Sequence, residues 1–425
     1  MANTYLTKTP GTSTNNNKFT MSVWVKRTKI TGDYQAIYTS RISGGAGAGL
    51  GLFIGNDDSV WYNSGTSSSA FQNTSTSAKL RDLSGWYNIV VAGDTTQSGT
   101  DKLKIWINNV QQTSFGNDNR SSFAGLSYDL GSATYANQLG RKHDGTYYLD
   151  AVLSHFHFID GTTYTPSTFG STDATTGEWK INTSPSVTYG NNGFFMFKDD
   201  NSLNDDSGNG NNFASGGGTL SKTEDCPSNV FATLNGLMNY TSSTITFSNG
   251  NTKATYPGAW IANQGTIGAI TGKYYWEAKV VSGNNQNLFY GICRPSIDLD
   301  SSPQNQTGVI CQHINGDRYL DGSYSSGAAQ ALVNGDILGV ALDLDSGTKT
   351  VKFYKNGSLL SSGSSINLTS TYDNEFVLPF FAGNSSSASS IWETNFGNGI
   401  FGTTTISSAG TNASNNGIFE YDVPT

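Results

Sequence analysis

The histidines at positions 155 and 157 are the first candidates for chemistry, because they alternate with aromatic residues along the chain. Side chains at i and i+2 lie on the same face of a strand, and two strand histidines at this spacing can bind zinc together with a third ligand. His143 is the one other histidine nearby. With so few ligands available, we favour the alternative in which His155 and His157 line the outer face of a sheet while Phe156 and Phe158 fill the core.

Paired carboxylates are the second candidates, since Asp343 and Asp345 also alternate onto one face. A retaining glycosidase needs two carboxyl groups about 5 Å apart across a sugar cleft. Asp343 and Asp345 instead open a polar turn, where aspartate side chains accept hydrogen bonds from nearby backbone N–H groups. The chain also has no G-x-S-x-G motif, P-loop or dinucleotide fingerprint. We therefore predict that the protein is not an enzyme, and a polysaccharide-degrading enzyme is the weaker alternative.

An oxygen-rich loop is the third candidate. Residues 205–211 read DDSGNGN, and oxygen ligands with glycine turns suit Ca²⁺. The loop lacks the terminal glutamate and the spacing of an EF-hand. Asp205, Asp206 and Asn209 are the residues that would hold Ca²⁺ if the loop binds it, and Asn56-Asp57-Asp58 is a weaker version of the same pattern. No other cofactor is expected.

Aromatic residues in loops could stack on sugar rings, with neighbouring Asn and Asp side chains binding hydroxyl groups. Trp61, Tyr62, Trp260 and Trp392 fit this description, and packing in a core or an interface is the alternative for each. We expect a ligand to lie on loops or on a concave sheet face. The candidate segments are Ser43 to Gly49, Asn56 to Asp58, Tyr256 to Trp260 and His313 to Tyr324. The candidate ligand-binding residues are Trp260, Tyr256, Asp317, Arg318, Tyr319, Tyr324, Asn56, Asp57 and Asp58.

The composition argues against several classes of protein. The net charge is −8 and 13% of residues are charged, without a basic stripe, so nucleic-acid binding is not expected. No run approaches 18 apolar residues, and the first residues lack the apolar region of a signal peptide, so we expect neither membrane insertion nor secretion. The 3 cysteines show no C-x-x-C spacing and are expected to be reduced thiols, which is typical of synthesis in a reducing cytoplasm.

The elements that would position these candidates are β-strands. The chain has 50 glycines and 12% aromatic residues, and Ser, Thr and Asn are frequent between its apolar stretches. Short alternating stretches separated by such residues favour an all-β protein over a disordered one. The strands predicted in the first half are 18–29, 34–41, 49–54, 59–63, 85–93, 102–110, 147–159 and 193–198.

Residues 335–357 predict an antiparallel hairpin in the second half. Two alternating apolar runs flank a polar turn, and Asn356-Gly357 fits a type I′ turn. The predicted inward positions are Ile337, Val340 or Ala341, Leu342, Val351 and Phe353.

A second strand of this half is predicted at Lys273 to Val281. Its alternation places Tyr274, Trp276 and Ala278 on one face, and we expect Trp276 to be mostly buried. The opposite face would carry Tyr275, Glu277 and Lys279.

Five motifs in the second half resemble the SPRY domain. The hairpin GDILGVALDLD…FYKNG is similar to the centre of that family. Four other motifs match its remaining strands in the same order: GKYYWE at 272–277, YGI at 290–292, LPFFA at 378–382 and NFG at 395–397. The resemblance implies an antiparallel β-sandwich over residues 233–400.

The first half resembles the laminin-G-like, concanavalin-like jelly roll. The matching pieces are FTMSVWV at 19–25, GWYNIVV at 85–91, KIWINN at 104–109 and LGR at 139–141. The predicted fold class is therefore all-β, with two tandem antiparallel jelly-roll-like β-sandwiches. The first would cover residues 1–213, followed by a linker at 214–232 that includes Ala214 to Gly218. Residues 401–425 are expected to be a C-terminal tail or the start of a further segment.

The segments around these two domains resemble tailed-phage virion structural proteins, in which a laminin-G-like domain precedes a SPRY domain. They read HFIDG at 157–161, YTPSTFG at 164–170, TGEW at 176–179, DDSGNGN at 205–211, PSNVFATLN at 227–235 and FEYDVP at 419–424. This compound arrangement spans most of the chain.

The resemblance implies a non-enzymatic virion surface protein, such as a fibre, appendage or adhesin, that contacts host glycans. It would be made in the host cytoplasm and bind other virion proteins. A homo-oligomer is expected, and a trimer if the protein is a fibre, because symmetric assembly can cover exposed edge strands. The alternative is a purely structural capsid-decoration or fibre protein that binds only other virion proteins. Clustered exposed aromatic residues would favour glycan binding, and burial of all of them would favour scaffolding.

Overall fold

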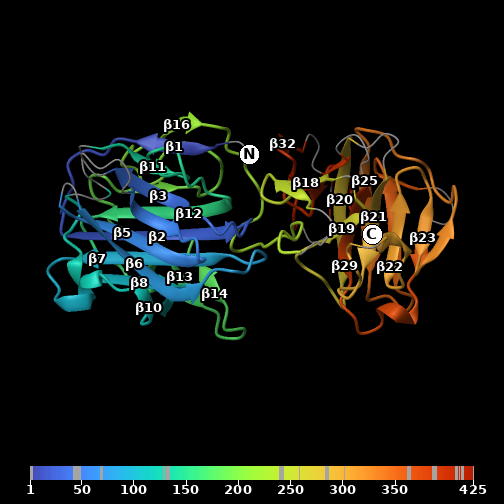
Figure 1. Cartoon of the computed structure of the whole chain (residues 1–425), viewed down its shortest axis with the longest axis horizontal. Coiled ribbons are helices and arrows are strands. Elements are labelled where there is room, and N and C mark those ends of the chain that lie inside the picture. Colours follow the sequence, from blue (N-terminus) through green and yellow to red (C-terminus); the bar gives the residue numbers. More distant parts are fainter. Residues whose placement is uncertain are drawn as a thin grey trace. The chain divides into compact units, whose positions relative to one another are not determined.

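The computed structural model of the chain divides into two compact units, Met1–Ser221 and Lys222–Thr425, drawn in blue to green and in yellow to red in Figure 1. All pairings between the described strands are antiparallel, and the longest described helix has four residues. The predicted all-β class with tandem sandwiches is therefore confirmed. The structure describes residues 3–41, 49–67, 70–127, 130, 135–238, 244–257, 259–282, 287–300, 302–360, 365–384, 390–406, 410, 412 and 416–424.

The first unit is built from two large sheets and a small two-stranded one. The eight-stranded sheet runs, in spatial order, β10 (Phe115–Asn117), β6 (Ala70–Lys79), β5 (Ser59–Ser67), β4 (Gly49–Ile54), β3 (Gln35–Arg41), β11 (Asn137–Leu139), β1 (Tyr5–Lys8) and β16 (Ala214–Gly217). The six-stranded sheet runs β15 (Phe194–Met196), β12 (Ala151–Asp160), β2 (Lys18–Arg27), β7 (Tyr87–Asp94), β8 (Leu103–Ile107) and β9 (Val110–Gln111). The small sheet pairs β13 (Gly170–Thr172) with β14 (Trp179–Ile181).

The second unit repeats this plan. Its eight-stranded sheet runs β17 (Thr246–Ser248), β18 (Lys253–Tyr256), β30 (Ser390–Asn395), β20 (Lys273–Ser282), β25 (Ile337–Asp343), β26 (Thr350–Lys355) and β27 (Ser358–Leu359), with β28 (Ser365–Asn367) also on β26. Its six-stranded sheet runs β19 (Ile261–Gln264), β29 (Leu378–Asn384), β21 (Asn287–Cys293), β22 (Val309–His313), β23 (Arg318–Leu320) and β24 (Ser323–Ser325). The small sheet pairs β31 (Ile400–Phe401) with β32 (Thr404–Thr405).

Five single-turn 3₁₀ helices lie in the described connections of both units. They are η1 (Gly99–Lys102), η2 (Arg120–Ser122), η3 (Pro166–Thr168), η4 (Pro303–Asn305) and η5 (Ser370–Tyr372).

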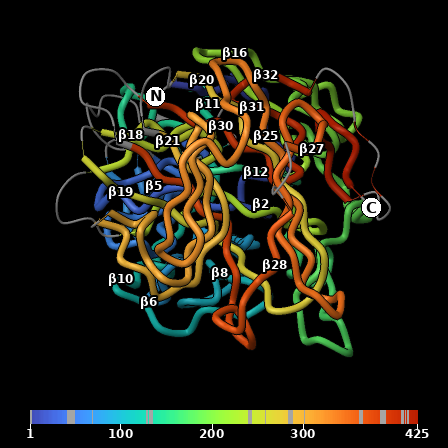
Figure 2. The backbone as a smooth tube through the Cα atoms, turned by 90° about the vertical axis from the view of Figure 1, so that its right-hand side faces the viewer, coloured from blue at the N-terminus to red at the C-terminus, as the bar shows by residue number. Residues whose placement is uncertain are grey.

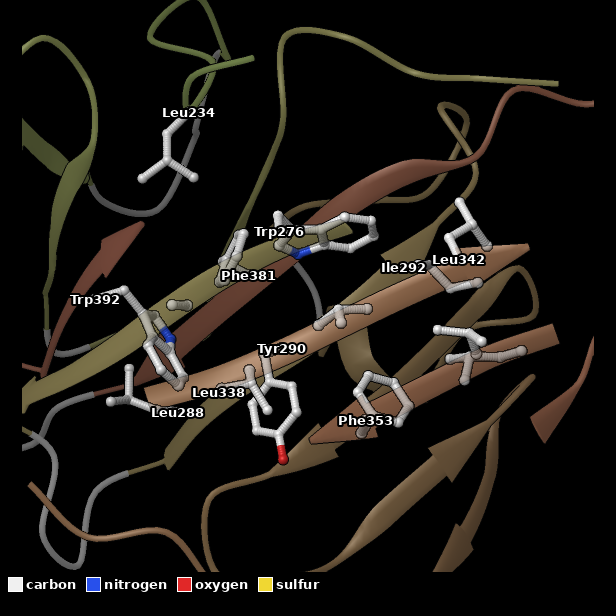
Figure 3. Packing of buried hydrophobic residues seen from close by; sticks show 14 of the residues in the cluster. Leu234, Trp276, Leu288, Tyr290, Ile292, Leu338, Leu342, Phe353, Phe381 and Trp392 are labelled. Carbon is white, nitrogen blue, oxygen red and sulfur yellow. The ribbon is translucent and has the colours of Figure 1, made fainter. Parts of the chain in front are cut away.

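Large side chains from both sheets fill the core of the second unit. The Tyr290 ring on β21 lies edge-on to Phe353 and Trp392 of the other sheet, with ring centroids 5.6 Å and 5.8 Å apart (Figure 3). Trp276 on β20 is 3% exposed and belongs to the same cluster (Figure 3). The predicted burial of Trp276 is confirmed, because period-two alternation in an antiparallel strand fixes its face.

Alternation also corrects one predicted position of the hairpin. Leu338, Val340 and Leu342 of β25 all belong to the core cluster, so Ile337 lies on the opposite face of the sheet. The prediction that Ile337 points inward is therefore wrong by one residue in register, whereas Val351 and Phe353 face the core as predicted.

The predicted domain limits change at two places. The segment predicted to open the linker forms strand β16, which pairs with β1 and so belongs to the first unit. Described residues beyond 401 pack against the second unit, where Phe419 is 4% exposed. Both segments are placed by contacts with residues far away in the chain, which a local sequence pattern does not show.

The histidines on β12 are structural, as we favoured. Phe156 and Phe158 lie in the core cluster. His157 is buried on the other face, where its ring stacks on Phe195 at 4.0 Å and its Nδ1 lies 2.8 Å from the Tyr189 hydroxyl. His155 occupies an irregularity in the pairing of β12 with β2, with a φ of 45°. Burial lowers the pKa of His155 from 6.5 to about 4, and burial also lowers the pKa of His157.

No described helix is long and apolar enough to cross a membrane.

We expect Trp276→Ala to lower the free energy of unfolding by about 3–5 kcal/mol, because it removes a buried indole and leaves a cavity. Urea denaturation of the full chain, followed by fluorescence, would measure the loss. Tyr274→Ala on the same strand is the matched control, since Tyr274 is 46% exposed and its removal should change stability by about 0.5 kcal/mol or less. Equal midpoints for the two variants would contradict the burial of Trp276.

The buried histidines predict acid sensitivity of the first unit. Below pH 6.5 the unfolded chain binds protons that folded His155 and His157 do not, so stability should fall as pH decreases towards 4. The slope should reach about 1.4 kcal/mol per pH unit for each histidine. Urea denaturation at pH 7 and pH 5 would measure it. A variant with His155→Gln and His157→Phe should flatten the difference, and an unchanged slope in that variant would contradict the assignment.

Candidate functional site

A row of aromatic side chains crosses the outer face of the six-stranded sheet in the second unit. Tyr290, Ile292 and Ile310 of this sheet point into the core, so Phe289 and Tyr319 lie on the opposite face. We call Trp260, Phe289, Tyr319 and Tyr324 the aromatic row. Its successive ring centroids are 5.6 Å, 5.6 Å and 5.2 Å apart. Three of these residues were predicted ligand-binding residues, and tertiary structure brings them together.

The exposure of the row increases from its middle to its edge. Phe289 is 1% exposed and forms the base, with the His313 ring 4.5 Å away. Trp260 and Tyr319 are half-buried, and Tyr324 on the edge strand β24 is 55% exposed. The row therefore presents aromatic surface to solvent while its base is fixed by packing.

Asp317 orients the exposed end of the row. Its Oδ2 accepts hydrogen bonds from the Tyr324 hydroxyl at 3.0 Å and from the Asn315 amide at 2.9 Å, and its Oδ1 accepts one from the Gly327 N–H at 2.9 Å. Burial acts to raise the pKa of Asp317, but the hydrogen bonds from Gly327, Asn315 and Tyr324 lower it overall. Asp317 is thus an ionised side chain beside the row that holds Tyr324 in place.

Two predicted residues do not join the row. Arg318 precedes Tyr319 on β23, so its side chain lies on the face that carries Gln312 and Leu320, opposite the row. Tyr256 is 2% exposed and packs so closely on Gly383 that a Cβ there would lie 2.6 Å from the tyrosine ring. Neither side chain therefore lies beside the aromatic row. Trp392, considered as a stacking residue, is also buried in the core.

Ion pairs hold the hairpin tip at Asn56–Asp58 against neighbouring strands of the first unit. Asp58 is 5% exposed, and its two oxygens pair with Arg27 at 2.9 Å and Arg81 at 3.0 Å. The Asp57 carboxylate pairs with Lys79 and accepts hydrogen bonds from Ser59. Both aspartates are therefore paired within the first unit. Asn56 and Asp57 are exposed and Asp58 is buried, so the structure does not support Asp58 as a ligand-binding residue. The candidate segment Ser43 to Gly49 lies almost wholly outside the described residues.

A second aromatic group, missed as a group by sequence reasoning, lies beside this turn. The Tyr34 ring centroid is 5.3 Å from that of Trp61 and 5.3 Å from that of Tyr147, and all three side chains are half-buried. The Trp61 Nε1 donates to Asp57 Oδ1 at 3.2 Å, which fixes the indole. The sequence signal was the position of Trp61 between Val60 and Tyr62, both of which are buried in the core.

The oxygen-rich loop at 205–211 is closed by its own hydrogen bonds. Asp205 Oδ1 accepts the N–H groups of Phe195 and Ser207, and its Oδ2 accepts the Ser207 hydroxyl and the Asn211 N–H, at 2.7–2.9 Å. The Asn209 amide nitrogen donates to the Gly190 and Gly193 carbonyls. Asp205 therefore has no lone pair to spare for calcium, and the Asn209 side chain is held by backbone carbonyls, so calcium at Asp205 and Asn209 is not supported, while the Asp206 assignment stays a prediction. In the described part of the chain, no three His, Cys, Asp or Glu side chains come together as a metal site.

Asp343 and Asp345 have the turn role that was predicted. Asp343 Oδ1 accepts the N–H groups of Asp345 and Ser346, and its Oδ2 accepts the Ser346 hydroxyl. Asp345 accepts the Gly272 N–H at 2.7 Å. The hydrogen bond from Ser346 is the main reason why the pKa of Asp343 lies well below its usual range, and Lys273 lowers it further.

Comparison with known families finds two matches in the chain. Residues 2–163 match the Concanavalin A-like lectin/glucanases superfamily, and residues 273–398 match the SPRY domain. No match to a curated protein was found.

Three solved SPRY structures are among those similar to this chain. The SPRY domain of human HERC1 is 19% identical with a TM-score of 0.29, and the match covers 35% of this chain and 91% of that one. The TRIM65 PSpry domain is 14% identical with a TM-score of 0.31, covering 39% and 91%. A human SPRY domain is 16% identical with a TM-score of 0.27, covering 35% and 93%. Sequence identities and TM-scores this low carry no information about the ligands of this chain.

The order of the two family matches is the order that the sequence motifs predicted, and each match lies within one of the two compact units. The chain therefore carries a concanavalin A-like domain followed by a SPRY domain.

Proposed function

We propose that this protein is a non-enzymatic binding protein on the surface of a tailed-phage particle, and that it contacts host glycans through the aromatic row. The observation that carries the proposal is the row itself, which ends in a 55% exposed tyrosine held by an ionised carboxylate. Rings of this kind stack on the apolar faces of sugars, and the adjacent Asp317 and Asn315 side chains can bind hydroxyl groups.

The proposal treats the acidic residues as structural rather than catalytic. Five carboxylates that the sequence offered for chemistry are engaged: Asp343 and Asp345 in a turn, Asp205 in a closed loop, and Asp57 and Asp58 in ion pairs. A catalytic carboxylate must be able to reach the proton of its substrate, and a carboxylate held by these contacts is already engaged within the protein. This supports a binding role over polysaccharide hydrolysis.

The motifs between and after the two domains, at 157–235 and 419–424, support the phage assignment, because they resemble those of tailed-phage virion proteins. The description of the first family includes lectins, which supports a sugar ligand for this protein as well. Tyr34, Trp61 and Tyr147 would then give the first unit a second stacking surface.

Single contacts of this kind are weak. A millimolar site corresponds to about 4 kcal/mol, so useful adhesion needs many copies acting together. We therefore propose that the protein works as a homo-oligomer, trimeric if it forms a fibre, held on the particle by other virion proteins. This would place it in the virion, after synthesis in the host cytoplasm.

A purely structural role is the second candidate, and one apolar surface favours it. Ile267, Ile270 and Phe376 are 40%, 45% and 55% exposed. They lie on neighbouring segments, because Ala269 and Val377 exchange backbone hydrogen bonds at 3.0 Å and 2.8 Å. Exposed apolar surface of this kind suits contact with another protein. A protein that binds only other virion proteins would use this surface and leave the aromatic row without a ligand.

The test is adsorption of multimerised full-length protein to a glycan array and to host cells. Tyr324→Ala should reduce apparent affinity about tenfold, equivalent to ~1.4 kcal/mol, because it removes the most exposed ring of the row. Trp260→Ala and Tyr319→Ala should also weaken adsorption. Tyr274→Ala is the matched control, since it removes an exposed tyrosine from the other sheet of the same unit.

Two results would favour the structural role instead. One is a multimer that ignores every host surface glycan. The other is adsorption of all three row variants at the level of the Tyr274→Ala control, provided that circular dichroism shows them folded.

A further inference from the structure

A buried carboxylate on the second unit holds a segment from more than a hundred residues further along the chain. We call residues 416–424 the strap. Glu277 lies on β20 between the core residues Trp276 and Ala278, so its side chain points to the outer face of the sheet. Its Oε2 accepts the Glu420 N–H at 2.8 Å and its Oε1 accepts the Tyr421 N–H at 3.0 Å. Although it is on the outer face, Glu277 is 0% exposed.

Further contacts complete a seat for the strap around Glu277. The Asn395 amide donates to the Ile418 carbonyl at 2.8 Å, and the Ile418 N–H donates to the Gly397 carbonyl at 3.0 Å. Phe419 is 4% exposed and meets the Tyr275 ring edge-on, with centroids 5.0 Å apart. The Tyr421 ring lies on Gly357, where a Cβ would come within 2.7 Å of it. In Figure 2 the red end of the tube accordingly runs near β27.

The seat selects for a peptide that bends at Glu420 and Tyr421, so that two successive N–H groups point to one side. All the groups that donate to Glu277 are neutral: two successive backbone N–H groups of the strap, the Asn395 amide and the Tyr275 hydroxyl. A buried carboxylate is costly unless its lone pairs are satisfied. The occupant must therefore present two consecutive N–H groups and, one residue earlier, an aromatic side chain for Tyr275, as Phe419 does.

The strap is attached less firmly than the strands around it. It contains no strand of its own, and Phe419 is its one buried side chain among the described residues 416–424. Segments with few buried apolar contacts open locally at a small fraction of the cost of global unfolding. The seat can therefore be vacated while the sandwich remains folded.

We propose that the seat also receives the strap of a second copy of this chain, so that copies are joined by exchange of residues 416–424. Every contact of the strap with the seat is available in trans as well as within one chain, so exchange sacrifices none of them. The remaining cost is the entropy of association, which falls when copies are concentrated on a common surface. The seat and the aromatic row share no residue, so this proposal does not depend on glycan binding.

The experiment mixes heavy-isotope and unlabelled full-length chains that carry Tyr421→p-benzoylphenylalanine. After incubation and illumination, mass spectrometry identifies the peptides joined to position 421. If straps exchange, peptides that contain Gly357 or Tyr275 will be joined to position 421 in mixed heavy–light pairs, and these pairs will increase with protein concentration.

Two further variants make the result specific. Phe419→Ala should abolish the mixed pairs, because it removes the aromatic anchor of the strap, and Phe376→Ala, which removes an exposed ring of the same unit outside the seat, should preserve them. Only same-isotope pairs at every concentration, or mixed pairs that persist in the Phe419→Ala variant, would overturn the proposal. Glycan adsorption of the same samples is measured in parallel and reports separately on the aromatic row.

Discussion

Carboxylates that accept backbone N–H groups hold the loops of both units. Asp205 closes the loop at 205–211, Asp343 shapes the turn after β25, and Glu277 fastens the strap. Asp160 is 1% exposed and binds the N–H groups of Thr14 and Asn192, which joins two segments far apart in sequence. Loops rich in Gly, Ser and Asn bury little apolar surface, so their conformations depend on these charge-assisted hydrogen bonds.

This use of acidic residues limits the chemistry that is left to the protein. A carboxylate whose two oxygens accept backbone N–H groups, or pair with cations as those of Asp58 do, has few lone pairs left to bind a substrate or a metal. The binding role proposed above needs side chains that are partly exposed and rigid. The aromatic row and the group around Trp61 meet that description, since each has a packed base or a hydrogen-bonded indole.

The aromatic row and the seat of the strap occupy separate parts of the second unit. The aromatic row lies on the outer face of the six-stranded sheet, and the seat of the strap lies on the outer face of the eight-stranded one. Under these proposals, one sandwich would offer both a surface for a weak ligand and a means of linking copies. A weak ligand is useful to an adhesin only when copies are joined, so the proposed exchange would supply the multivalency that the proposed site requires.

Local sequence determined the strands and much of the core, because alternation at period two fixes which side chain faces inward: Trp276, Phe156 and Phe353 are buried as predicted. The order of the motifs was also enough to predict that a concanavalin A-like domain precedes a SPRY domain. Trp260, Tyr319 and Tyr324 were chosen from the sequence as aromatic residues in loops. Their convergence required the successive pairing of β19, β29, β21, β22, β23 and β24. Only tertiary structure decided that Arg318 faces away, that Tyr256 is buried and that Glu277 is covered by the strap. Those outcomes depend on register and on segments distant in the chain, and a local pattern carries no information about what will cover the outer face of a sheet.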